Sequence, residues 1–235
     1  MKVKLLAYTP NADRLAAASA FSTVSEQGAI ELIETVDDDK MRKVLKSTVG
    51  KGHHSVIEHA SFTFSVEGVS RACTHQLVRH RIASYSQQSQ RYVKYDNPLF
   101  IVPHTIEKNE DAKKIFDKSL ENMIGDYKKL LEMGIPAEDA RFLLPNATPT
   151  NIVITMNARE LVHFFSLRCC YRAQWEIREM ADAMLKEAKK AAPAIFENAG
   201  PSCVRLGYCP EKNSMSDHCK SVGVEKIKEE YKSLK

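Results

Sequence analysis

The feature that most constrains the fold of this chain is a set of long helical patterns broken by few strand-like runs. Residues 2–8 form one short apolar run, and Phe62, Phe64 and Val66 alternate with polar residues in a second. Residues 149–156 are rich in β-branched side chains, which favour strands. Few strands among many helices predict a single α+β domain with more helix than strand.

Apolar spacing and end signals predict where the helices lie. Asn11 is a candidate cap for a helix over 11–22, and three aspartates favour the start of another over 37–49. Ser55 and Glu58 have the spacing of a capping box, which predicts a short helical turn. Further helices are expected over 69–81, 107–133, 136–143, 157–170 and 173–191, and an amphipathic stretch places Val224, Ile227, Tyr231 and Leu234 on one face. Residues 82–92 are polar and are expected to be irregular.

Composition excludes several classes of protein. The 235 residues are 43% hydrophobic and 27% charged, which is typical of a globular chain with a sizeable core. The net charge of +4 is too small to require a nucleic-acid partner. No apolar run reaches the length of a membrane span, and the N-terminus has no secretory pattern. We therefore expect a cytoplasmic protein whose six cysteines are thiols or metal ligands.

The common nucleotide-binding loops are absent from the sequence. Neither G-x-G-x-x-G nor G-x-x-x-x-G-K-[ST] occurs, and the nine glycines do not cluster. Any nucleotide must then be held by side chains or by helix N-termini.

The most informative segment is basic and lacks acidic residues. No acid occurs between Glu67 and Asp96, and the segment carries Arg71, Arg79, Arg81, Arg91, Lys94, His75 and His80. Arginine suits phosphate or carboxylate, and the serines and glutamines of 84–89 add neutral donors and acceptors. On a helix, Gln76, Arg79 and His80 would share a face. Two other interpretations stay open: a solvated basic face, or a nucleic-acid surface with Tyr85, Tyr92 and Tyr95 as stacking residues.

Within this segment the sequence resembles the flavin-dependent thymidylate synthases. Arg79-His80-Arg81 and Ser89 match the R-H-R-x7-S signature of that family. The resemblance extends to GHHSVIEHASFTF, to Ala140-Arg141 with Leu144-Pro145, and to NARELVHFFSLR with AQWEIR. It covers His53 to Arg178, with gaps.

The resemblance implies a reaction, a fold and an assembly. It implies an FAD-dependent methyltransferase with a reductive step, which makes dTMP from dUMP with methylenetetrahydrofolate as the one-carbon donor and NADPH as the reductant. It implies an α+β fold, with helices packed on a small, mostly antiparallel sheet, in a homotetramer with active sites at subunit interfaces. No enzyme cysteine is expected to act as nucleophile, and neither a nucleic acid nor a membrane is an expected partner. We expect a synthase-like domain over residues 1–200 and a cysteine-containing tail over 201–235.

The resemblance also implies residue roles. The expected catalytic residues are Arg168, Ser89 and His53, with Ser89 in binding and substrate activation rather than as nucleophile. The dUMP site is expected to comprise Gln76, Arg79, Gln87, Ser89, Arg91, Arg141 and Arg168. The FAD site is expected to comprise His53, Ser55, Glu58, Arg79, His80, Arg81, Ile82, Asn157, Arg159 and His163. Arg159 and His163 are one helical turn apart, as are Arg168 and Arg172.

Several of these residues have structural alternatives. Glu58 can serve only as a helix cap, His53 and His54 as loop residues, and Arg141 as an ion-pair partner. Trp175 is expected in the core. An inactive paralogue remains a rival interpretation, because the sequence shows residues and not turnover.

The cysteines divide into two groups. Cys73, Cys169 and Cys170 are expected on helices as packing residues. Cys203, Cys209, His218 and Cys219 have spacings that are too wide for a strong zinc signature. We therefore expect reduced thiols and no metal, with a structural metal as the alternative.

Overall fold

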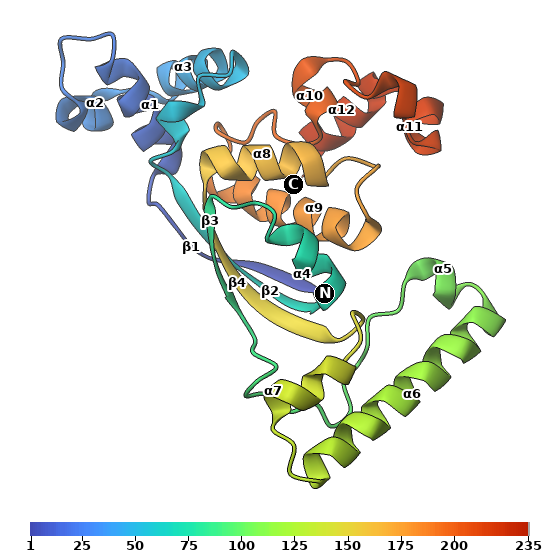
Figure 1. The fold of residues 1–235 in the computed structure, drawn as a ribbon. Coiled ribbons are helices and arrows are strands. Elements are labelled where there is room, and N and C mark those ends of the chain that lie inside the picture. The colour runs from blue at the N-terminus through green and yellow to red at the C-terminus, as the bar shows by residue number, and fades with distance from the viewer. Residues whose placement is uncertain (235) are drawn as a thin grey trace. The chain divides into compact units, whose positions relative to one another are not determined.

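The computed structural model describes residues 1–234, so the last residue of the 201–235 segment lies outside the described part. The elements, in order, are β1 (Lys2–Tyr8), α1 (Ala12–Ser22), α2 (Ala29–Thr35), α3 (Asp38–Gly50), η1 (His54–Ile57), β2 (Ser61–Ser70), α4 (Arg71–Leu77), β3 (Ala83–Gln87), α5 (His104–Glu107), α6 (Glu110–Glu132), α7 (Ala137–Ala140), η2 (Arg141–Leu143), β4 (Pro149–Asn157), α8 (Ala158–Arg168), α9 (Trp175–Ala191), α10 (Ser202–Leu206), η3 (Lys212–Ser214), α11 (Asp217–Val222) and α12 (Val224–Ser233) (Figure 1).

The strands form one small sheet in the order β1-β2-β4-β3. The Thr63 and Thr155 hydroxyls meet at 2.9 Å, and the Gly68 amide donates to the Asn151 side chain at 3.1 Å. The two contacts advance in opposite directions along β2 and β4, so this pair is antiparallel. The predicted α+β class, with helices around a small antiparallel sheet, is confirmed.

The described chain forms two compact units, and the strands continue from one into the other. The smaller unit comprises residues 1–2, 66–79 and 86–152, and the larger comprises 3–65, 80–85 and 153–235 as far as the described part extends. The larger unit has an aromatic core, in which the Phe196 ring meets those of Phe62 and Phe165 at 5.3 and 6.0 Å between centroids. Tyr95 and Tyr127 lie in the core of the smaller unit.

Side-chain caps fix the starts of α3 and α8. The Asp37 carboxylate accepts from the Lys40 amide at the start of α3, and the Asn157 side chain accepts from the Glu160 amide at the start of α8. Each cap satisfies an amide that has no partner within the helix. Asn11 differs from the prediction: it adopts a left-handed conformation, with φ at 52°, and its side chain makes no cap hydrogen bond.

The signature segment folds differently from the sequence prediction. Helix α4 ends at Leu77, so Gln76, Arg79 and His80 do not share a helical face. Residues Ala83–Gln87 form strand β3 rather than an irregular segment. Pairing with β4 stabilises this strand, and its polar sequence gives no hydrophobic alternation that would have revealed it.

The segment between α8 and α9 also corrects the predictions. Helix α8 ends at Arg168, so Cys169, Cys170 and Arg172 lie in the connection and not on a helix. Gln174 caps α9 through its side chain, which accepts from two backbone amides. Trp175 at the start of α9 is half-buried rather than in the core. The short helix α2 was not predicted. Among the described residues, no helix has the length and apolar character needed to span a membrane.

Candidate active site

Helix α8 positions the central side chains of the larger unit. It begins directly after β4, and its first turns carry Arg159, Glu160 and His163. Glu160 is buried, whereas Arg159 and His163 are exposed. Arg159 and His163 are four residues apart and therefore lie on one side of the helix, as predicted.

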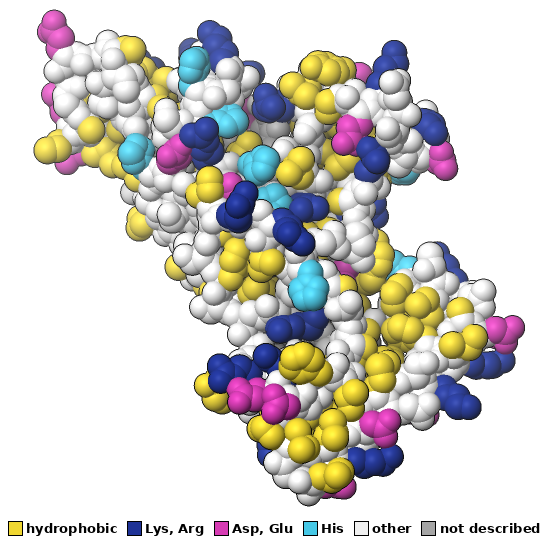
Figure 2. All heavy atoms as spheres, viewed as in Figure 1, with side chains coloured by type: hydrophobic (Ala, Val, Ile, Leu, Met, Phe, Trp, Pro, Cys, Tyr) yellow, Lys and Arg dark blue, Asp and Glu magenta, His cyan; other side chains and the backbone are white. Residues whose placement is uncertain are grey.

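A cavity of about 550 Å³ lies over this side of α8. Its lining comprises His54, Glu58, Ile82, Asn157, Arg159, Glu160, Val162, His163, Ser166 and Arg205. Figure 2 shows histidine and basic side chains gathered on the same face of the larger unit. Two guanidinium groups and an exposed isoleucine give the cavity both a cationic part and an apolar part.

Opposite charges in the cavity are already partly paired. Arg159 donates a charged hydrogen bond to Glu58, and both side chains remain open to solvent. Arg205 adds a second guanidinium to the lining. Burial lowers the pKa of His54, and the nearby Arg205 and Arg159 lower it further. Arg159 and Arg205 therefore give the cavity two guanidinium donors that can contact an anionic group of a ligand.

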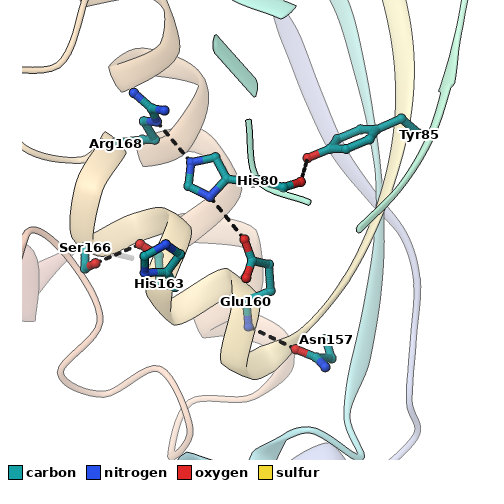
Figure 3. A network of polar contacts seen from close by, with 7 residues as sticks. All are labelled: His80, Tyr85, Asn157, Glu160, His163, Ser166 and Arg168. Atoms are coloured by element: carbon teal, nitrogen blue, oxygen red, sulfur yellow. Dashed lines mark hydrogen bonds and ion pairs between the residues drawn. The ribbon is translucent and has the colours of Figure 1, made fainter. Parts of the chain in front are cut away.

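A polar network links His80 to α8 (Figure 3). The His80 side chain is 3% exposed; its Nδ1 lies 3.1 Å from the Glu160 carboxylate, and its Nε2 accepts from Arg168 Nε at 3.0 Å. Because a guanidinium can only donate, the neutral ring must carry its proton on Nδ1 and donate it to Glu160. The Tyr85 hydroxyl donates to the His80 carbonyl at 2.7 Å. His80 thus holds the Arg168 guanidinium in a fixed orientation.

Burial and positive neighbours keep His80 neutral. Burial lowers its pKa to about 4, with further contributions from Arg168 and His163. Burial also raises the pKa of Glu160. The pairing with Glu160 favours a charged ring and opposes this lowering of the His80 pKa. The adjacent Arg168 guanidinium makes a second positive charge unfavourable, so the geometry supports a lowered pKa.

This shift predicts a pH dependence of stability. The unfolded histidine takes up a proton near pH 6.5, whereas folded His80 does so only near pH 4. The free energy of unfolding should therefore fall as the pH drops from about 6.5 to 4, by roughly 3 kcal/mol at most. Urea unfolding at pH 7 and pH 4.5, compared with His80→Gln, measures this contribution. An equal loss of stability in both proteins would contradict it.

His80, Glu160 and His163 also meet the spacing expected of cation ligands. One ligand atom from each lies within 4.8 Å of the others. Arg168 occupies the other nitrogen of the same imidazole, and its positive charge opposes a bound cation. We therefore interpret this group as the polar network described above.

The smaller unit contains a second group of predicted site residues. The Gln87 amide donates to the hydroxyls of Thr74 and Thr150 at 3.0 and 3.3 Å, and both threonines are buried. These two bonds fix the orientation of the amide, so that its oxygen is available as an acceptor. The sequence places Gln76 on α4, close to Thr74 in the chain.

Two predicted arginines of this unit meet at Glu138. Arg91 Nε donates to the Glu138 carboxylate at 2.8 Å, and Arg141 Nε donates to the Glu138 carbonyl at 3.0 Å. Burial lowers the pKa of Arg71, and the positive charge of Arg141 lowers it further, which places a third guanidinium nearby. Three guanidinium groups with one carboxylate leave an excess of positive charge that suits a phosphate.

The Ser89 hydroxyl is bonded to the backbone of its own turn. Its hydroxyl accepts from the Arg91 amide at 3.2 Å. A serine nucleophile needs a base that takes its proton. This geometry is consistent with the predicted role in binding.

The two compact units divide the predicted site residues between them. Glu58, Ile82, Asn157, Arg159 and His163 line the α8 cavity. His53, Ser55 and Arg81 belong to the same unit but not to that lining, and His54 lines it in place of His53. The smaller unit contains Gln76, Arg79, Gln87, Ser89, Arg91 and Arg141. The boundary between the units falls inside the signature, after Arg79.

Sequence reasoning missed Glu160, Glu138 and Arg205. Glu160 is an acid three residues before His163 in the first turn of a helix, where an acid is usually only a favourable charge. Glu138 is 47 positions from Arg91, whose guanidinium its carboxylate accepts from, and Arg205 is distant in sequence from the α8 residues that line the same cavity. No local sequence signal pointed to Glu160, because its contact with His80 joins residues 80 positions apart.

The fold and the α8 site define an α+β protein with a polar ligand cavity that contains two arginines. Comparisons with known proteins identify the family. Residues 4–194 match the family model Thy1, the thymidylate synthase complementing protein. The flavin-dependent thymidylate synthase of Geobacter sulfurreducens is 50% identical over 90% of this chain and 91% of its own length. Those of Clostridium tetani and Pyrococcus abyssi are 48% and 45% identical, over 90% and 93% of this chain and 91% and 93% of their own lengths.

A solved structure supports the same conclusion. A UMP/dUMP methylase, PolB, from Streptomyces cacaoi, bound with 5-Br dUMP, has a TM-score of 0.75 and 26% identity. The alignment covers 83% of this chain and 93% of that chain. The chain therefore belongs to the flavin-dependent thymidylate synthase family and is an enzyme, as the signature predicts.

Proposed function

We propose that this enzyme methylates dUMP to dTMP with FAD as its redox cofactor. The observation that carries the proposal is the α8 cavity, whose lining includes five of the residues that the signature family predicts for flavin. The similarity to flavin-dependent thymidylate synthases and to a methylase bound with 5-Br dUMP supports it.

The residues present fit FAD. Arg159 and Arg205 provide positive charge for a pyrophosphate, and the exposed Ile82 provides an apolar surface for a ring. When bound, FAD supplies the reducing equivalents that the methyl group requires. The protein's part is to bind and orient the cofactor and to keep Arg168 in place through His80.

Removal of Arg159 should weaken flavin binding. The Arg159→Ala variant loses a guanidinium from the cavity and leaves Glu58 unpaired, so we expect the FAD dissociation constant to rise by about 10- to 100-fold. Arg14→Ala is a matched control, because Arg14 forms an ion pair with Asp38 outside this cavity. FAD titration followed by flavin fluorescence gives both constants, and equal affinities would argue against a flavin at this position.

We assign dUMP binding to the residues that the signature family predicts for it. These are Gln76, Arg79, Gln87, Ser89, Arg91, Arg141 and Arg168. The guanidinium groups of Arg91 and Arg141 suit the phosphate, and the oriented Gln87 amide suits a polar edge of the sugar or base.

Substrate activation is assigned to charge rather than to a thiol. Uracil C5 is a poor nucleophile, and a guanidinium near the pyrimidine stabilises the ionised ring. We assign this role to Arg168, with His53 and Ser89 in supporting catalytic roles.

Methylenetetrahydrofolate as the one-carbon donor, NADPH as the reductant and a homotetramer complete the proposal. An anaerobic assay of dTMP formation tests it, with each of FAD, NADPH and methylenetetrahydrofolate omitted in turn. We expect product only in the complete mixture. Product without added folate, or no product in the complete mixture, would contradict the proposal.

A further inference from the structure

Four cysteines line a second cavity of the larger unit. The cavity measures about 460 Å³, and its lining includes Cys170, Cys203, Cys209 and Cys219. Cys170 lies between α8 and α9, Cys203 on α10, Cys209 after α10 and Cys219 on α11. Four separate segments thus bring thiols to one space, although 32 residues separate Cys170 from Cys203 in the sequence.

The four thiols are close enough to interact and are withdrawn from solvent. Cys219 is 9% exposed, and the other three are half-buried. Burial raises the pKa of Cys203 to about 11, and the neighbouring Cys170, Cys209 and Cys219 raise it further. All six cysteines of the chain lie within the described residues and are free thiols.

The four thiols are spread around the cavity rather than gathered at one point. Two thiolates on one zinc ion lie within about 4.6 Å of each other, because each Zn–S bond is about 2.3 Å. Among residues 1–234, the group whose ligand atoms come within 4.8 Å is His80, Glu160 and His163, and the cysteines do not form such a group. Four cysteines around an open space instead match the ligand set of an iron–sulfur cluster, whose thiolates bind different irons.

We propose that Cys170, Cys203, Cys209 and Cys219 bind an iron–sulfur cluster. Its four thiolates carry excess negative charge, and the guanidinium groups of Arg168 and Arg172 line the same cavity. Leu167, Val224 and Ile227 supply an apolar lining that limits access of water. Cluster binding displaces the four thiol protons.

This assignment revises the sequence prediction for the tail. The sequence leaves Cys203, Cys209, His218 and Cys219 as the candidate ligand set and favours no metal. In the structure the His218 ring lies against Tyr171, with centroids 4.0 Å apart, and does not line the cavity. Cys170, which is distant in sequence, takes its place.

The test is the iron and acid-labile sulfide content of the full chain, purified without oxygen or reconstituted with ferrous iron and sulfide. We expect about four of each per chain, and an electron paramagnetic resonance signal after reduction. Cys209→Ser should lose most of both, whereas Cys73→Ser, which alters a buried thiol outside this cavity, should retain them. Circular dichroism shows whether each variant is folded.

Zinc alone, no metal, a disulfide between two of the four, or full iron in Cys209→Ser would each overturn the proposal. The iron and sulfide contents do not depend on methylation of dUMP. A cluster without dTMP formation would contradict the proposed function and leave this assignment standing.

Discussion

Arg168→Ala should lower the rate of tritium release from C5-labelled dUMP by about 1,000-fold, equivalent to roughly 4 kcal/mol of transition-state stabilisation. Arg168 is the proposed source of positive charge beside the pyrimidine, and His80 accepts its Nε hydrogen bond at 3.0 Å. Alanine removes both the charge and this contact. The loss should appear in kcat as well as in kcat/KM, because the charge acts on the ionised ring.

Arg168→Lys separates charge from geometry. Lysine keeps a positive charge but lacks the planar fork whose Nε bonds His80. We expect the rate of Arg168→Lys to be about 10-fold above that of Arg168→Ala and still below that of the wild type. Rates within 3-fold of wild type in the alanine variant would remove Arg168 from the mechanism.

Arg79→Ala should abolish measurable tritium release. Arg79 is exposed just after α4, so its removal leaves the core intact, and the signature assigns it to both dUMP and FAD. Removal of a side chain that contacts two ligands should lower the rate more than removal of a side chain that contacts one.

Lys94→Ala is the control for this variant, because Lys94 lies in the same acid-free segment but outside the predicted site. We expect it to retain the wild-type rate. Equal rates in the Arg79 and Lys94 variants would contradict the assignment of the signature triplet.

The sequence predicts those parts of the fold that depend on local signals. The Asp37 cap of α3 and the alternation of Phe62, Phe64 and Val66 in β2 are such signals, and the structure contains both elements. Strand β3 depends on pairing with β4, more than 60 residues away, and its own residues are polar. Its prediction required a contact that no local pattern contains.

The same limit applies to the site. The spacing of Arg159 and His163 on α8 follows from helical geometry and was predictable. The His80–Glu160 contact joins residues 80 positions apart. Because α4 ends at Leu77, His80 lies outside that helix and can contact Glu160. The thiol cavity also depends on a long-range contact. Cys170 lines it together with the tail cysteines, although Cys170 is distant from them in the sequence.

The proposed reaction requires that flavin and dUMP bind next to each other in the enzyme. Its most direct test is the visible absorbance of the purified protein with FAD added and then dUMP, read as a difference spectrum so that other chromophores cancel. We expect bound-flavin bands near roughly 370 and 450 nm that shift when dUMP is added. A protein that binds no FAD, or whose flavin bands do not respond to saturating dUMP, would contradict the account.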